Sequence, residues 1–104
     1  GLVIPKINTG NTHVFHQFVI RITSDFPLSR EKLIEKLKWE GIGTNIYYPK
    51  PLHLHPHFEK MGYKIWDFPV AEKMSLEVLA LPVHPSVTEE EAYFIVETLK
   101  KYGK

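Results

Sequence analysis

Residues 47–56 constrain the fold of this chain more than any other segment. Their sequence is Tyr-Tyr-Pro-Lys-Pro-Leu-His-Leu-His-Pro, with three prolines, two tyrosines and two histidines in ten positions. Proline fixes φ and has no amide hydrogen, so this segment can continue neither a helix nor a central strand. We therefore predict a stiff, extended loop. Such a loop fills a core poorly but presents phenol and imidazole groups well to a ligand.

The composition excludes several classes of protein. The chain has 104 residues, enough for one small domain. Its 13 basic and 12 acidic residues give a net charge of +1, which provides no reason to expect nucleic acid or a membrane as a partner. Cysteine is absent, so disulfides, zinc–thiolate sites and thiol catalysis are excluded. No apolar run is long enough to span a membrane and no signal peptide opens the sequence, so we expect a cytoplasmic protein.

Apolar periodicity predicts three strands. Residues 14–22 are rich in β-branched and aromatic side chains, with apolar residues on both faces, and this pattern is typical of a central strand. Residues 43–48 predict a second strand, which runs into the proline-rich loop. Residues 77–81 predict a third, with Val78 and Ala80 on one face.

Capping residues locate the helices between and after these strands. Ser29 is a suitable N-cap for a helix over residues 30–40. Thr88 and Glu91 form a capping box at the start of the last helix. Proline at position 69 favours a shorter helix over residues 69–75.

These elements predict an α/β (α+β) fold of the two-layer sandwich type. We expect a small, mainly antiparallel sheet of about three strands with helices packed on one face. The other face also carries apolar residues, so we expect a missing partner surface there. Residues 1–12, which contain Pro5 and Gly10, are expected to be a linker that precedes a domain of residues 13–104.

Four side chains near the loop are candidates for binding a ligand. Adjacent strand residues face opposite ways, so one of Tyr47 and Tyr48 is expected in the core and the other at the end of the strand with its hydroxyl free. The alternative is that both tyrosines are packed or lie at the sheet surface. His53, His55 and His57 alternate, and in an extended segment they could bind a metal such as zinc. No further ligand or supporting hydrogen-bond partner is evident, so we favour a hydrogen-bonding role and predict no metal site.

Other polar residues suggest structural roles. Arg21 lies on an apolar strand and needs a carboxylate or phosphate partner, and structural pairing is favoured. Asp67 and Glu72 do not resemble an acid–base pair, because no nucleophile accompanies them, so Glu72 is interpreted as a local ion pair or cap. The sequence contains no glycine-rich phosphate loop, nucleophile elbow or catalytic triad pattern.

Five ordered blocks extend this interpretation. They are His13–Arg21, Arg30–Leu33 with Gly41–Thr44, Tyr48–His53, Phe68–Glu72, and Leu79–Pro82 with Pro85. In this order and spacing they resemble the C-terminal small domain of the DegT/DnrJ/EryC1/StrS family, the pyridoxal-phosphate-dependent sugar aminotransferases of fold type I.

The resemblance implies a homodimeric enzyme that transfers an amino group, commonly from glutamate, to a keto sugar carried on a nucleotide. Such enzymes serve polysaccharide or antibiotic sugar biosynthesis. The family's large N-terminal domain binds pyridoxal 5′-phosphate and supplies the Schiff-base lysine, so this chain alone is not expected to be catalytic. Tyr48 and His53 occupy the family's loop motif and are implied to face the substrate, with Tyr47 and His55 as weaker candidates. The resemblance assigns no cofactor-binding residue to this chain.

Two alternatives remain open at this stage. The chain could be a stand-alone, non-catalytic regulatory or nucleotide-sugar-binding module, because some family members were first described as regulators or sensors. It could also belong to a dehydratase-type relative that uses the same fold and cofactor.

Overall fold

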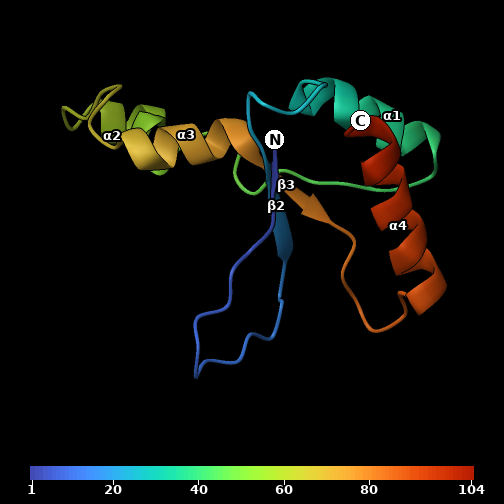
Figure 1. The fold of residues 1–104 in the computed structure, drawn as a ribbon. Helices are drawn as coiled ribbons and strands as arrows, with labels where there is room; N and C mark the ends of the chain where they lie inside the picture. Colours follow the sequence, from blue (N-terminus) through green and yellow to red (C-terminus); the bar gives the residue numbers. More distant parts are fainter.

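A small antiparallel sheet organises the computed structural model, which describes residues 1–104. Its strands lie in the order β1–β2–β3, so β2 is central, as predicted. Helices α1 and α4 lie on one side of the sheet, whereas α3 and α2 extend away on the other (Figure 1). The elements are β1 (Leu2–Val3), β2 (Phe18–Ile22), α1 (Arg30–Trp39), the 3₁₀ helix η1 (Leu52–Leu54), α2 (Pro56–Glu59), α3 (Pro69–Glu77), β3 (Val78–Leu81) and α4 (Glu89–Tyr102).

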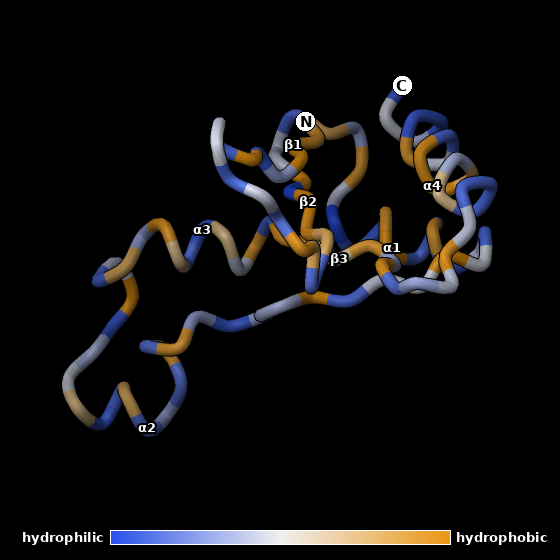
Figure 2. Tube along the Cα trace, turned by 90° about the horizontal axis from the view of Figure 1, so that it is seen from below, coloured by the Kyte–Doolittle hydropathy of each residue, from blue (hydrophilic) through white to orange (hydrophobic).

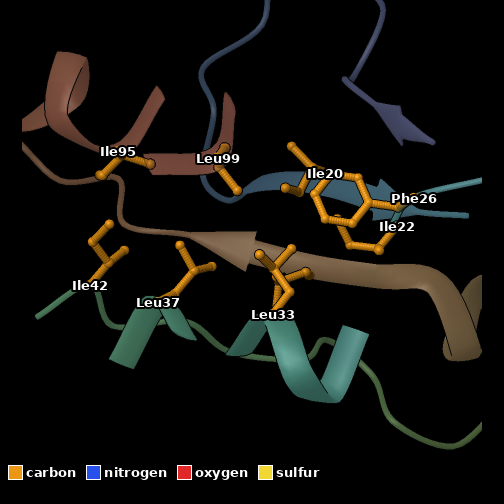
Figure 3. Packing of buried hydrophobic residues seen from close by; sticks show 9 residues of the cluster. Ile20, Ile22, Phe26, Leu33, Leu37, Ile42, Ile95 and Leu99 are labelled. Carbon is orange, nitrogen blue, oxygen red and sulfur yellow. The ribbon is translucent and has the colours of Figure 1, made fainter. Parts of the chain in front are cut away.

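The core fills the space between the sheet and the two covering helices. Strands β2 and β3 pair antiparallel, with Ile20 opposite Leu79, and both side chains are almost fully buried. Leucines from α1, aliphatic residues from α4, and Phe26 and Ile42 from connecting segments belong to the same cluster of nine buried residues (Figure 3). Each fully buried side chain of this size contributes about 1.5–3 kcal/mol. This arrangement confirms the predicted α+β fold. The cluster consists of Ile20, Ile22, Phe26, Leu33, Leu37, Ile42, Leu79, Ile95 and Leu99.

The opposite face of the sheet contains an ion pair as well as apolar residues. Val19 and Arg21 of β2 are in register with Ala80 and Val78 of β3. Arg21 donates from Nε and Nη2 to Glu77 Oε2, at 2.9 and 2.5 Å. The structural pairing predicted for Arg21 is therefore confirmed. Val78 and Ala80 are buried, so the sheet exposes less apolar surface than the sequence suggested.

Residues 51–77, which carry η1, α2 and α3, form a projection that we call the arm. Figure 2 shows the arm extending from the sheet, with polar and apolar residues alternating along it. Several large apolar side chains of the arm are exposed, among them Trp66, which is 76% exposed, Met61 and Val70. The main uncovered apolar surface is therefore on the arm and not on the sheet.

Two predicted strands differ from the structure. The segment 14–22 becomes a strand only at Phe18, because Phe15 adopts a positive φ of 46° and donates its amide hydrogen to His13 Nδ1 at 2.8 Å. Residues 43–48 form no strand, and only Asn45 pairs with β3, at Ala80. The Asn45 side-chain oxygen accepts the Ile46 amide hydrogen at 2.9 Å, a local bond that competes with further pairing.

The predicted loop and the predicted linker also differ from the structure. The loop 47–56 is not extended throughout, because η1 and the start of α2 lie within it. The third strand of the sheet is β1, from the segment predicted to be a linker, and it pairs with the end of β2.

The predicted helices are confirmed, with small changes in length. Ser29 accepts the Lys32 amide hydrogen and caps α1, and the capping box at Thr88 and Glu91 opens α4. Helix α3 runs two residues further than predicted, to Glu77. None of the helices is both long and apolar enough to cross a membrane.

Candidate functional site

The two tyrosines lie outside the core, beside a shallow depression. Tyr47 is 37% exposed, and its hydroxyl oxygen accepts a hydrogen bond from Asn45 Nδ2 at 2.7 Å. Tyr48 is 73% exposed, has no hydrogen bond to its hydroxyl, and contacts the Tyr47 ring edge-on at 5.9 Å. The prediction that one tyrosine is in the core is therefore wrong, because this segment is not a strand and its side chains do not alternate between two faces.

The depression has a volume of about 440 Å³, and its lining combines polar and apolar residues. The two backbone segments that line the depression are joined by the Asn45–Ala80 bridge, whose two hydrogen bonds measure 3.1 and 2.7 Å. Tyr47 is the only sequence-predicted site residue that lines it. The side chains of the lining that can form hydrogen bonds are those of His16, Gln17, Thr44, Asn45 and Tyr47.

His53 lies in the arm and is only 7% exposed. The 3₁₀ helix η1 turns its side chain inward, where Nε2 lies 2.9 Å from Glu72 Oε1. The imidazole also packs edge-on against the Phe68 ring, with the centroids 4.9 Å apart. The predicted hydrogen-bonding role of His53 is therefore directed, through Nε2, into the protein.

Glu72 connects three segments of the arm. It lies in the first turn of α3, where a negative charge interacts favourably with the helix dipole. Besides contacting His53, its Oε1 accepts the backbone amide hydrogens of Trp66 at 2.8 Å and Phe68 at 3.4 Å. Of the two local roles expected for Glu72, an ion pair or a cap, the cap is confirmed by the bonds to the Trp66 and Phe68 amides. Its pairing with His53 was not predicted, although both residues lie in the blocks that carry the family resemblance.

The other histidines of the loop do not join His53. His55 and His57 are exposed, and His55 contributes its backbone carbonyl to the start of α2, accepting the amide hydrogens of Phe58 and Glu59. The three imidazoles do not share a side, because η1 and α2 replace the extended segment on which that expectation depended. No group of three or more His, Asp or Glu side chains that could hold a metal ion is present.

The predicted residues therefore fall into two separate places. Tyr47 and Tyr48 contact each other beside the depression, whereas His53 lies in the arm in contact with Glu72 and Phe68. No hydrogen bond or ring contact joins the tyrosines to His53. The first place presents two exposed or half-exposed phenol groups, and the second contains an imidazole that is almost completely buried.

Comparison with known proteins identifies the family. Residues 1–100 match the DegT/DnrJ/EryC1/StrS aminotransferase family. The chain belongs to this family. A pleiotropic regulatory protein of Geobacillus stearothermophilus is 43% identical over 97% of this chain and 26% of its own length. The dTDP-3-amino-3,6-dideoxy-alpha-D-galactopyranose transaminase of Aneurinibacillus thermoaerophilus is 34% identical over 96% of this chain and 26% of its own length.

Solved structures of this aminotransferase family share the fold. The crystal structure of S. venezuelae DesV in complex with a ketimine intermediate superposes with a TM-score of 0.89, at 26% identity, over 100% of this chain and 27% of that chain. A DegT DnrJ EryC1 StrS aminotransferase from Brucella abortus gives a TM-score of 0.83 at 30% identity, over 99% of this chain and 26% of that one. The chain thus spans about a quarter of the length of the relatives it matches.

Proposed function

We propose that this chain is the substrate-side part of a pyridoxal-phosphate-dependent aminotransferase that acts on nucleotide-linked keto sugars. The observation that carries the proposal is the superposition of the whole chain on DesV bound to a ketimine intermediate. Relatives named as transaminases of dTDP-linked amino sugars support the substrate class. In this proposal residues 1–12 connect to a large N-terminal domain, residues 13–104 are the C-terminal small domain, and the whole enzyme is a homodimer.

The chain's own residues do not fit the cofactor. A Schiff-base lysine is activated by desolvation or by a neighbouring cation, but every lysine of this chain is exposed. The pKa of Lys101 is raised by its hydrogen bond to Glu40, which is the opposite of activation. We therefore assign the cofactor and its lysine to the large domain. The exposed apolar side chains of the arm support a further protein surface against this chain.

The role proposed for this chain is to hold the sugar nucleotide. Tyr48 offers an exposed ring and a free hydroxyl, which suit stacking and hydrogen bonding to a nucleotide or sugar. Tyr47 can still donate its hydroxyl hydrogen, because the Asn45 contact uses the oxygen as acceptor. His53 offers Nδ1, and His55 offers an exposed imidazole. Fixing the substrate through such groups orients the reacting carbon toward the cofactor.

Kinetics of the full-length enzyme test this role. His53→Ala and Tyr48→Phe are each expected to raise KM for the keto sugar nucleotide about tenfold, the effect of losing one hydrogen bond to a ligand. The cofactor absorbance of each variant should be unchanged. His57→Ala is the control, since His57 is exposed on the same arm and has no proposed role. Wild-type KM and kcat in the His53→Ala variant would refute the assignment.

A second candidate is a nucleotide-sugar-binding or regulatory module without catalysis. It is favoured by the name of the 43% identical relative, a pleiotropic regulatory protein. Isothermal titration calorimetry of the full-length protein with dTDP- and UDP-linked sugars, combined with an amino-transfer assay on the same sample, separates the two functions. Binding without transfer supports the module, and transfer supports the aminotransferase.

A further inference from the structure

His53 has one ring nitrogen committed to the protein and one that is not. Nε2 contacts Glu72 Oε1 at 2.9 Å, whereas no protein group forms a hydrogen bond with Nδ1. No buried side-chain nitrogen or oxygen in the structure lacks a hydrogen-bond partner, so Nδ1 must retain access to solvent. Nδ1 is therefore able to form a hydrogen bond with water or with a ligand.

We propose that Glu72 is a positioning residue that fixes the tautomer and the orientation of His53 for substrate binding. A carboxylate only accepts hydrogen bonds, so the hydrogen shared with Glu72 is on Nε2. In the neutral ring, Nδ1 then carries the lone pair and accepts a hydrogen bond from a hydroxyl or amide group of the sugar nucleotide. This inference rests on the proposed function, because the substrate role of His53 does.

The same oxygen of Glu72 also fixes the surroundings of the imidazole. It accepts the amide hydrogens of Trp66 and Phe68, and the Phe68 ring packs edge-on against His53. Trp66 has a positive φ of 78°, a conformation that a non-glycine residue rarely adopts without support from its neighbours. Glu72 therefore holds Nε2 of His53 directly, and it holds Phe68, which packs against the His53 ring, through the Phe68 backbone amide. Removal of its carboxylate should free the ring to rotate.

The first test determines the tautomer of His53 in the wild-type protein. In full-length protein labelled with ¹⁵N-histidine, long-range ¹H–¹⁵N spectra should show His53 as the Nε2–H tautomer, and the Nδ1 resonance should shift when a nucleotide sugar is added. An Nδ1–H tautomer in the wild-type protein would overturn the proposal. The assignment of the His53 resonance comes from its disappearance in the His53→Ala variant.

Variants at position 72 test the consequence for binding. Glu72→Ala should raise KM for the keto sugar nucleotide about tenfold, change kcat less than twofold, and give His53 a mixture of tautomers. Glu72→Gln keeps an acceptor oxygen and should restore most of the affinity and the tautomer. Glu59→Ala is the matched control, because Glu59 is an exposed acidic residue of the same arm whose side chain has no partner. A folded Glu72→Ala protein with wild-type KM and an unchanged tautomer would overturn the positioning role.

The outcomes distinguish this inference from the proposed function. If His53→Ala has normal kinetics, the substrate role of His53 fails, whatever the tautomer. If His53→Ala raises KM but Glu72→Ala leaves both KM and tautomer unchanged, only the positioning role fails. If Glu72→Ala does not fold, the wild-type tautomer and the Glu72→Gln variant decide, since a Gln variant with wild-type KM but a changed tautomer would contradict the link between the two.

Discussion

Arg30 joins a helix of the core to the arm, and its replacement should loosen α3. It is the first residue of α1, and its guanidinium Nη1 donates to the carbonyl oxygen of Ser75 at 2.6 Å and to that of Val78 at 3.4 Å. Both carbonyls lie at the C-terminal end of α3, where the helix leaves acceptors without internal partners. A cation at that end also interacts favourably with the helix dipole.

The cost of Arg30→Met follows from the burial of these groups. The Arg30 side chain is 10% exposed, and Ser75 is buried, so the carbonyl that loses its donor cannot fully recover the bond from water. An unsatisfied buried acceptor costs about 1–3 kcal/mol, and the lost helix-end interaction adds a few tenths. Methionine retains much of the apolar stem, which limits the packing loss. We expect a loss of about 2 kcal/mol, or about thirtyfold in the local opening equilibrium.

Hydrogen exchange measures this opening at the helix itself. The Val78 amide, which donates to Met74 O, should exchange about thirtyfold faster in Arg30→Met, whereas amides of α4 should be unaffected. Lys32→Met is the matched control, because Lys32 is a cation of the same helix whose exposed side chain has no partner. Exchange of the last turn of α3 that is unchanged within about threefold would refute the view that Arg30 holds this helix end.

Two further predictions concern the core and the contact between α1 and α4. Leu79→Ala, at a fully buried position of β3, should lower the free energy of unfolding by about 2–5 kcal/mol with an unchanged urea m-value; a loss below about 1 kcal/mol would contradict the packing described. Lys101 Nζ donates to Glu40 Oε1 at 2.6 Å, which lowers the pKa of Glu40 and raises the pKa of Lys101. The stabilisation from Glu40 is complete above its unfolded pKa of about 4.3 and is lost as pH falls through its lowered folded pKa. The stabilisation from Lys101 is complete below its unfolded pKa of about 10.4 and is lost as pH rises through its raised folded pKa. Glu40→Gln should therefore flatten the acid limb of a pH–stability curve, and an unchanged limb would contradict this assignment.

Features determined by near neighbours in sequence were predictable, and features determined by distant contacts were not. Ser29 and Thr88 cap their helices through bonds to residues three positions away, so the sequence pattern suffices. His53 meets Glu72 across nineteen positions, and the alternating histidines gave no indication of it. The strand expected at residues 43–48 failed for a local reason that the pattern did contain: an asparagine side chain that bonds to the next backbone amide.

Strand β3 sets the position of both parts of the candidate site. Helix α3 runs directly into β3, and its C-terminal end is fixed by Arg30 at Ser75 and by Arg21 at Glu77. The opposite end of α3 carries Glu72 and therefore His53. The segment that carries Tyr47 is attached to the same strand through the bridge at Ala80. Because the two groups of site residues do not touch each other, their relative position depends on β3 and on the stiffness of α3. A substitution that shifts α3 should therefore alter substrate binding through His53 while it leaves the Tyr47 contact with Asn45 intact.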